Sequence, residues 1–237
     1  MDRCFKALVM LGMCFVPGLK TAALFLALAL PVLAQQTISF PTQDGGLIFG
    51  DVYGKGERAV VLAHGGRFNK QGWAEQARSI AAAGFRALAI DFRGEGQSRG
   101  ATAADVEAGR RFDVLGAVHY LRRTGAKSVS VVGASMGGDY AAEAAEIEPK
   151  AIDRLVLLAS GAYTTLDNFK APKLFILARD DANDDGPRLP QIRARYEKAA
   201  DPKELIIVDG SAHAQFLFQT DQGARVMREI LRFLTQR

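Results

Sequence analysis

The sequence predicts an α/β domain with a mainly parallel sheet covered by helices on both faces. From Ala59 onward, short apolar runs alternate with longer segments of helical period, an order typical of parallel strands joined by helices. Strands of such sheets are buried on both faces and therefore read as continuous apolar runs. The chain has 237 residues, of which 49% are hydrophobic and 24% charged, so we expect one globular domain.

An antiparallel hairpin is expected to lead into this sheet. Its strands are Thr37–Phe40 and Leu47–Tyr53, and Asp44-Gly45-Gly46 supplies the turn between them. Six further strands are predicted: Ala59–Ala63, Ala87–Ile90, Val129–Val132, Leu155–Ala159, Leu174–Ala178 and Leu205–Val208.

Helices are predicted in the segments between and after these strands. Gly84 and Gly125 follow the first two helices, at positions where glycine commonly caps a helix C-terminus. The expected helices are Trp73–Ala83, Ala104–Arg123, Met136–Ala145, Leu189–Ala200 and Asp221–Phe233.

Residues 1–34 have the features of a secretory signal peptide. Basic residues precede two apolar runs, and the second run, Thr21–Ala34, ends in small residues. We predict cleavage before Gln35, so that the mature protein is secreted or periplasmic. An uncleaved N-terminal membrane anchor is the alternative, but this run has 14 residues, whereas a span needs ~20. Three methionines are candidate starts: Met1, Met10 and Met13.

Composition excludes several classes of function for the mature chain. Both cysteines, Cys4 and Cys14, lie in the signal segment, so neither disulfides nor thiol chemistry is expected. Removing three basic residues and one acidic residue with that segment, from totals of 30 and 26, leaves a net charge of +2. This is too small an excess to predict a nucleic-acid partner. We expect no cofactor and no membrane span in residues 35–237.

A candidate nucleophile follows the apolar run Val129–Val132. The segment Gly133-Ala134-Ser135-Met136-Gly137 fits a G-x-S-x-G strand-to-helix turn, in which glycines make room for a strained serine. The pattern is common by chance in a chain with 24 glycines. The evidence that Ser135 is a nucleophile therefore depends on the residues at the other strand ends, because active sites of such sheets gather beyond the carboxyl ends of the strands.

Backbone donors and a histidine follow two other strands. His64-Gly65-Gly66 follows Ala59–Ala63, and the N–H groups of Gly66 and Met136 could form an oxyanion hole. His213 follows the last strand in a loop of small residues and is the candidate general base. His64 is expected to hold its loop by a hydrogen bond, and His119 to be a packed or half-exposed helix residue.

The acid that orients the histidine is expected after Leu174–Ala178. Asp181 is the first choice, and Asp180 and Asp184 stay open. The same loop fits the first half of a calcium site, but Ile192 stands where a bidentate glutamate is needed, so we expect no metal. Asp91 and Arg93, in the turn after Ala87–Ile90, are expected to brace that turn rather than to react.

With these motifs assembled, the chain resembles the α/β-hydrolase superfamily over residues 37–237. The motifs are His64-Gly65-Gly66, Asp91-x-Arg93-Gly94-x-Gly96-x-Ser98, Gly133-x-Ser135-x-Gly137-Gly138, Asp181 and Gly210-x-x-His213. The resemblance is to small serine hydrolases of the monoacylglycerol-lipase or serine-aminopeptidase type, or of the dienelactone-hydrolase type. It implies a catalytic domain at 35–237 with a Ser135, Asp181 and His213 triad. The family glycine three residues before the acid is Ala178 here, which is why Asp180 and Asp184 remain alternatives.

The resemblance also implies what the active site lacks. Relatives with a cap domain usually insert it where only Gly161–Lys173 stands, so we expect no cap and an open site. Small or polymer-attached esters suit such a site. A peptidase or amidase, or an inactive binding protein of the same fold, are the alternatives. Four aromatic residues are candidates for its walls: Phe68, Tyr163, Phe169 and Phe216.

Overall fold

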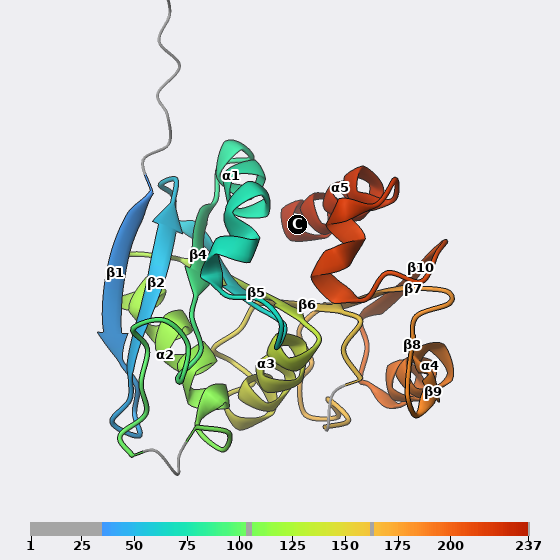
Figure 1. Ribbon diagram of the computed structural model, residues 1–237. Coiled ribbons are helices and arrows are strands. Elements are labelled where there is room, and N and C mark those ends of the chain that lie inside the picture. The colour runs from blue at the N-terminus through green and yellow to red at the C-terminus, as the bar shows by residue number, and fades with distance from the viewer. Residues whose placement is uncertain (1–34, 103–105, 162–163, 237) are drawn as a thin grey trace, which may run out of the picture. The chain divides into compact units, whose positions relative to one another are not determined.

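The computed structural model describes residues 35–102, 106–161 and 164–236, which form an eight-stranded sheet with helices on both faces (Figure 1). The predicted signal segment and Tyr163 lie outside these residues. The sheet order is β1-β2-β4-β3-β5-β6-β7-β10. Its strands are β1 (Gln36–Pro41), β2 (Leu47–Tyr53), β3 (Arg58–Ala63), β4 (Arg86–Ile90), β5 (Ser128–Ala134), β6 (Arg154–Leu158), β7 (Lys173–Ala178) and β10 (Lys203–Val208).

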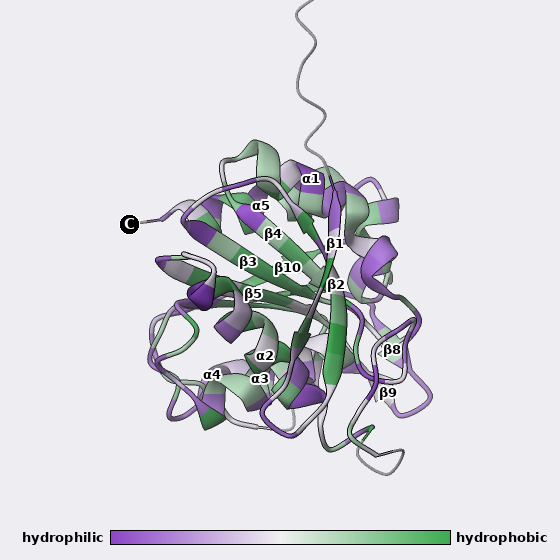
Figure 2. Ribbon diagram, turned by 90° about the vertical axis from the view of Figure 1, so that its left-hand side faces the viewer, coloured by the Kyte–Doolittle hydropathy of each residue, from purple (hydrophilic) through white to green (hydrophobic). Residues whose placement is uncertain are grey.

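The strand directions confirm the predicted α/β architecture. The hairpin β1-β2 and the pair β2-β4 are antiparallel, and every pair from β4 across to β10 is parallel. The central strands are fully buried along most of their length, as their unbroken apolar sequences require. Figure 2 shows the hydrophobic character of β3, β4 and β5 between the helical layers.

The helices cover the two faces of the sheet. Helices α1 (Ala74–Ala82) and α5 (Gly223–Thr235) lie on one side, and α2 (Arg110–Arg123) and α3 (Met136–Ile147) lie on the other (Figure 1). Helix α4 (Arg188–Lys198) packs near β7. Gly84 and Gly125 have φ values of +86° and +97° directly after α1 and α2, which are the left-handed conformations expected of C-terminal caps.

Short elements and one helix boundary differ from the sequence-based expectation. Helix α2 begins at Arg110, and residues 106–109 form turns instead of its predicted first part. Gly109 keeps helical backbone angles, and a Cβ at this position would overlap the guanidinium of Arg93. A two-stranded ribbon, β8 (Ala182–Asn183) with β9 (Gly186–Pro187), and the 3-10 turns η1 (Lys70–Trp73) and η3 (Ala214–Gln219) are further elements that the sequence pattern did not indicate.

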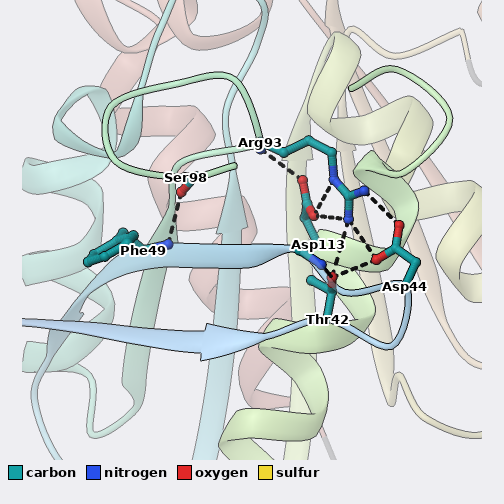
Figure 3. A network of polar contacts seen from close by, with 7 residues as sticks. Thr42, Asp44, Phe49, Arg93, Ser98 and Asp113 are labelled. Carbon is teal, nitrogen blue, oxygen red and sulfur yellow. Dashed lines mark hydrogen bonds and ion pairs between the residues drawn. The ribbon is translucent and has the colours of Figure 1, made fainter. Parts of the chain in front are cut away.

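A buried ion network fixes the turn after β4 (Figure 3). The Arg93 side chain is fully buried and donates from Nε and Nη2 to Asp113 Oδ1 at 2.8 and 2.7 Å. It also donates from Nη1 to Asp44 Oδ2 at 2.6 Å. The turn itself closes through the Phe49 N–H, which donates to Ser98 Oγ at 2.9 Å. This network ties the β1-β2 turn, the β4 turn and α2 together.

The pKa values of the acids in this network reflect burial and pairing in different proportions. Burial raises the pKa of Asp113 to about 6, although hydrogen bonds from Arg93 act in the opposite direction. Asp44 is more exposed. Burial also acts to raise its pKa, but hydrogen bonds from Arg93 and Thr42 outweigh it, so the net shift is downward. Asp91 braces the same region by accepting the Lys70 N–H at 2.8 Å.

The segment between β6 and β7 contains no cap domain, and within the described part of the chain no helix is long and apolar enough to cross a membrane. The carboxyl ends of β3, β5, β7 and β10 are therefore left open at one edge of the sheet. The functional residues predicted from the sequence all follow these ends.

Replacing Arg93 by methionine should destabilise the fold by about 3 kcal/mol, because the buried Asp113 carboxylate would lose its partner. Urea denaturation of the purified protein measures this change. The control is Arg123→Met on the exposed surface of α2, which should change stability by less than about 0.5 kcal/mol. A loss at Arg93 no larger than that of the control would show that the network does not stabilise the fold.

Candidate active site

Ser135 occupies a strained turn between β5 and α3. Its backbone angles are φ +49° and ψ −120°, a conformation that residues other than glycine rarely adopt. The flanking glycines allow this turn. A Cβ on Gly133 would lie 2.5 Å from Gly137 O, and one on Gly137 would lie 2.5 Å from His64 O. Glycine is thus required on both sides of Ser135, because the end of β5, the start of α3 and the end of β3 lie too close together for a Cβ.

The structure brings Ser135, His213 and Asp181 together from three strand ends. His213 Nε2 lies 2.8 Å from Ser135 Oγ, and His213 Nδ1 lies 2.7 Å from Asp181 Oδ2. Asp181 is buried, whereas His213 is 28% exposed at its side chain, so the relay runs from the interior to an accessible serine. This geometry keeps the Nδ1 proton on the Asp181 side and leaves Nε2 free to accept the Ser135 proton.

Of the three candidate acids, only Asp181 is buried among the described residues. Asp180 and Asp184 are exposed, and neither has a hydrogen bond to His213. The backbone of Asp181 is held by the Arg188 N–H, which donates to its carbonyl at 2.9 Å. Arg188 Nε also lies 3.5 Å from Asp181 Oδ1, an ion pair without hydrogen-bond geometry. Arg188 is therefore a neighbour of the site that the sequence motifs did not indicate.

Backbone donors of two segments meet beside Ser135. Met136 is the first residue of α3, and the N–H groups of a helix's first turn have no carbonyl within their own helix to bond. Gly66 lies next to it, since a Cβ on Gly66 would be 3.7 Å from Met136 Sδ. Both residues line one small pocket with Ser135 and His213.

The Gly65-Gly66 loop is held by two buried side chains. Gln215 Oε1 accepts the Gly65 N–H at 2.8 Å, which links this loop to the turn that follows His213. The ring of His64 lies between Gly65 O, at 2.9 Å from Nδ1, and the Phe92 N–H, which donates to Nε2 at 3.3 Å. Because Nε2 accepts, Nδ1 carries the proton. Gln215 is a supporting residue that no sequence motif predicted.

Burial lowers the pKa of His64 below its ordinary value of 6.5, which keeps the ring neutral. The sign of the resulting pH dependence follows from linkage. Between the lowered folded pKa and 6.5, the unfolded chain binds the proton more strongly than the folded protein, so stability falls as the pH falls through this window.

Two pockets of different character meet at Ser135. The smaller, of about 260 Å³, is walled by Phe68 and Phe216, whose ring centroids lie 4.8 Å apart. The larger, of about 830 Å³, is lined mainly by polar and charged side chains of α2, α3 and the start of α4. The expectation for Phe169 was wrong: it is fully buried and packs under Lys173, because its loop folds into the core.

The acidic loop after β7 forms a short two-stranded ribbon in the described structure. Asn183 donates to Asp185 Oδ2 at 3.1 Å within the β8-β9 ribbon. Among residues 35–102, 106–161 and 164–236, no group of three histidine, cysteine, aspartate or glutamate side chains is arranged to hold a metal ion. His119 is half-exposed on α2 and lies 2.8 Å from Glu148.

The family model for the alpha/beta hydrolase fold matches residues 58–218, and the chain belongs to this family. The 2-hydroxy-6-oxononadienedioate/2-hydroxy-6-oxononatrienedioate hydrolase of Cupriavidus pinatubonensis is 34% identical over 113 residues, which are 46% of this chain and 38% of that protein. The enzyme of the same name from Burkholderia vietnamiensis is 33% identical over 111 residues, with the same coverage. The chain thus matches well under half the length of these relatives.

Solved structures share the fold over most of the chain. An esterase of Pyrococcus furiosus has a TM-score of 0.68 and 20% identity, covering 85% of this chain and 94% of its own. A dienelactone hydrolase of Anabaena variabilis has a TM-score of 0.68 and 21% identity, covering 84% and 96%. At these identities the likeness establishes the architecture only.

Replacing Gly137 by alanine should destabilise the protein by about 2 to 3 kcal/mol, because the new methyl group would overlap the backbone at His64. Thermal or urea unfolding measures the loss. Gly161→Ala is the matched control, since a Cβ there meets nothing closer than 3.8 Å. Equal stability of the two variants would contradict the crowding that we assign to the elbow.

Wild-type protein should lose stability between pH 7.5 and 5.5 more steeply than a His64→Gln variant, because the variant lacks the buried group whose pKa is lowered. Urea denaturation at the two pH values gives the comparison. If His64→Gln loses stability as steeply as the wild type, burial of His64 does not govern this pH dependence.

Proposed function

We propose that this chain is a serine hydrolase that cleaves carboxylic esters through an acyl-enzyme. The observation that carries the proposal is the continuous relay from Asp181 through His213 to Ser135, with contacts of 2.7 and 2.8 Å, ending on a serine in a strained turn. A serine hydroxyl is a weak nucleophile at neutral pH unless an adjacent base accepts its proton. The relay supplies that base and its orienting carboxylate.

The first half of the proposed reaction forms the acyl-enzyme. His213 Nε2 takes the Oγ proton as Ser135 attacks the ester carbonyl carbon. The carbonyl oxygen becomes an oxyanion, and the N–H groups of Gly66 and Met136 are the proposed donors that hold it. Collapse of this intermediate breaks the bond to the alcohol oxygen, which leaves with the proton from His213.

The second half releases the acid. Water enters beside His213, gives it a proton and attacks the acyl carbon. The Ser135 oxygen then leaves with that proton, and the enzyme returns to its starting state. Asp181 stabilises the positive imidazole in both halves without itself taking the proton. The two halves together consume one ester and one water and release one alcohol and one acid.

The peptidase alternative has less support in this pocket. It needs a carboxylate to bind a substrate amine, and two of the three acids that line the larger pocket are engaged: Glu143 pairs with Arg111 at 3.4 Å, and Asp139 accepts the Ser160 hydroxyl at 2.7 Å. The match covers 38% of the length of the curated relative, which is too little to assign that protein's activity to this chain. The predicted export of residues 35–237 would bring the site to esters outside the cytoplasm.

Labelling with a fluorophosphonate probe, followed by a panel of phenyl esters and anilides, tests the proposal. Wild-type protein should be labelled and should cleave esters. The Ser135→Ala variant should not be labelled, and its kcat should be lower by about 10⁶-fold. Thermal unfolding confirms that the variant is folded. A folded wild-type protein that is neither labelled nor active would support the inactive binding protein, and faster cleavage of anilides would support the amidase.

Three asparagine variants distinguish the orienting acid from its neighbours. Asp181→Asn should lower kcat by about 10⁴-fold, because an amide favours the wrong histidine tautomer. Asp180→Asn and Asp184→Asn remove equal charge from the same exposed loop and should retain wild-type kcat. A large loss at either control with little loss at Asp181 would reassign the acid.

A further inference from the structure

The two pockets at Ser135 differ in which side of the serine they occupy. Both include Ser135 and Met136, but within the described structure only the small apolar pocket includes His213. His213 must deliver a proton to the departing alcohol oxygen in the proposed reaction. The alcohol part therefore lies in the small pocket walled by Phe68 and Phe216, and the acyl part extends into the larger polar pocket.

The charged side chains of the larger pocket do not all balance one another. They are Glu107, Arg110, Arg111, Asp139, Glu143 and Arg188. Arg111 and Glu143 form an ion pair, Asp139 is bonded to Ser160, and Glu107 is exposed. Arg188 lies near Asp181, a carboxylate that already serves His213.

Among the described residues, Arg110 is the arginine of this set without a carboxylate partner. No carboxylate of the described residues lies within ion-pair distance of it, although the side chain is only partly exposed. It donates from Nη1 to Met136 Sδ at 3.3 Å, a weak acceptor, and its guanidinium carbon lies 5.7 Å from the Tyr140 ring centroid. Its Nε is buried and has no hydrogen-bond partner.

Arg188 lies on a different element. Its Nε is buried and pairs with Asp181 Oδ1 at 3.5 Å, but without a hydrogen bond. Arg110 begins α2, and Arg188 begins α4, so two cations from separate helices line one cavity beside the nucleophile. Buried donors without partners are rare in folded proteins, because each one costs the hydrogen bond it had in water. The Nε atoms are enclosed, so an acceptor supplied by the substrate would meet the part of each guanidinium group that lines the pocket.

We propose that the acyl part of the substrate carries a carboxylate, which Arg110 binds with Arg188 beside it, while the alcohol part is small and apolar. This inference rests on the proposed ester hydrolysis and specifies its substrate class as monoesters of dicarboxylic acids. The planar guanidinium pairs well with carboxylates, and such a bond is strongest where water is partly excluded.

Monophenyl adipate, compared with its neutral terminal-amide analogue, tests the inference. The two esters have the same length and leaving group, and phenol matches the aromatic wall of the small pocket. Wild-type protein should show kcat/KM about tenfold or more higher for the carboxylate ester, as expected for a charge-assisted hydrogen bond. Arg110→Gln should reduce this ratio to near one. Arg123→Gln, an equal charge change on the exposed surface of the same helix, should keep the wild-type ratio.

Binding to the Ser135→Ala protein separates this inference from the proposed reaction. Titration calorimetry should detect tighter binding of monophenyl adipate than of its amide analogue, with the difference lost when Arg110→Gln is added. Wild-type cleavage of both esters at equal kcat/KM would overturn the anionic acyl site and leave ester hydrolysis standing. A folded protein that binds the carboxylate ester selectively but cleaves neither ester would overturn the hydrolysis instead. Absence of both selectivity and cleavage would count against each.

Discussion

Close backbone packing at the β5-α3 turn is the constraint on which the rest of the site depends. Gly137 lets this turn pass against the end of β3, and Gly133 lets it fold back on the start of α3; no Cβ would fit at either position, and Ser135 between them has φ +49°. The same contact sets the loop after β3 next to the first turn of α3. Ser135 and the Gly65-Gly66 loop are thus positioned by one packing contact rather than by separate interactions.

The polar groups around this turn form two layers of support. Near the serine, Gln215 and His64 hold the Gly65-Gly66 loop to neighbouring segments through buried hydrogen bonds. Farther away, Arg93 joins its own turn to the β1-β2 turn through Asp44 and to α2 through Asp113. Arginine suits this position because its five donors satisfy several acceptors at once without losing charge. Both layers are buried, so they restrict loops that would otherwise be mobile in an open site.

The absence of a cap gives the surrounding helices a direct influence on specificity. With only a short segment between β6 and β7, the larger pocket is built from α2, α3 and the start of α4. The side chains beside Ser135 therefore include Arg110 and Arg188, which lie at helix starts and outside every recognised motif. In this architecture, substrate preference can change by substitution on these helices without altering the relay from Asp181 to Ser135.

Local sequence determined which segments form strands and helices, the family and the residues at the strand ends, because buried parallel strands and glycine-rich turns have strong local signatures. Three features depend on the tertiary structure. Helix α2 begins at Arg110, beside the buried Arg93, and Phe169 is buried in the core. The choice of Asp181 as partner of His213 over Asp180 and Asp184 depends on which carboxylate faces inward after β7. One residue of register separates inward from outward, and only long-range packing fixes it.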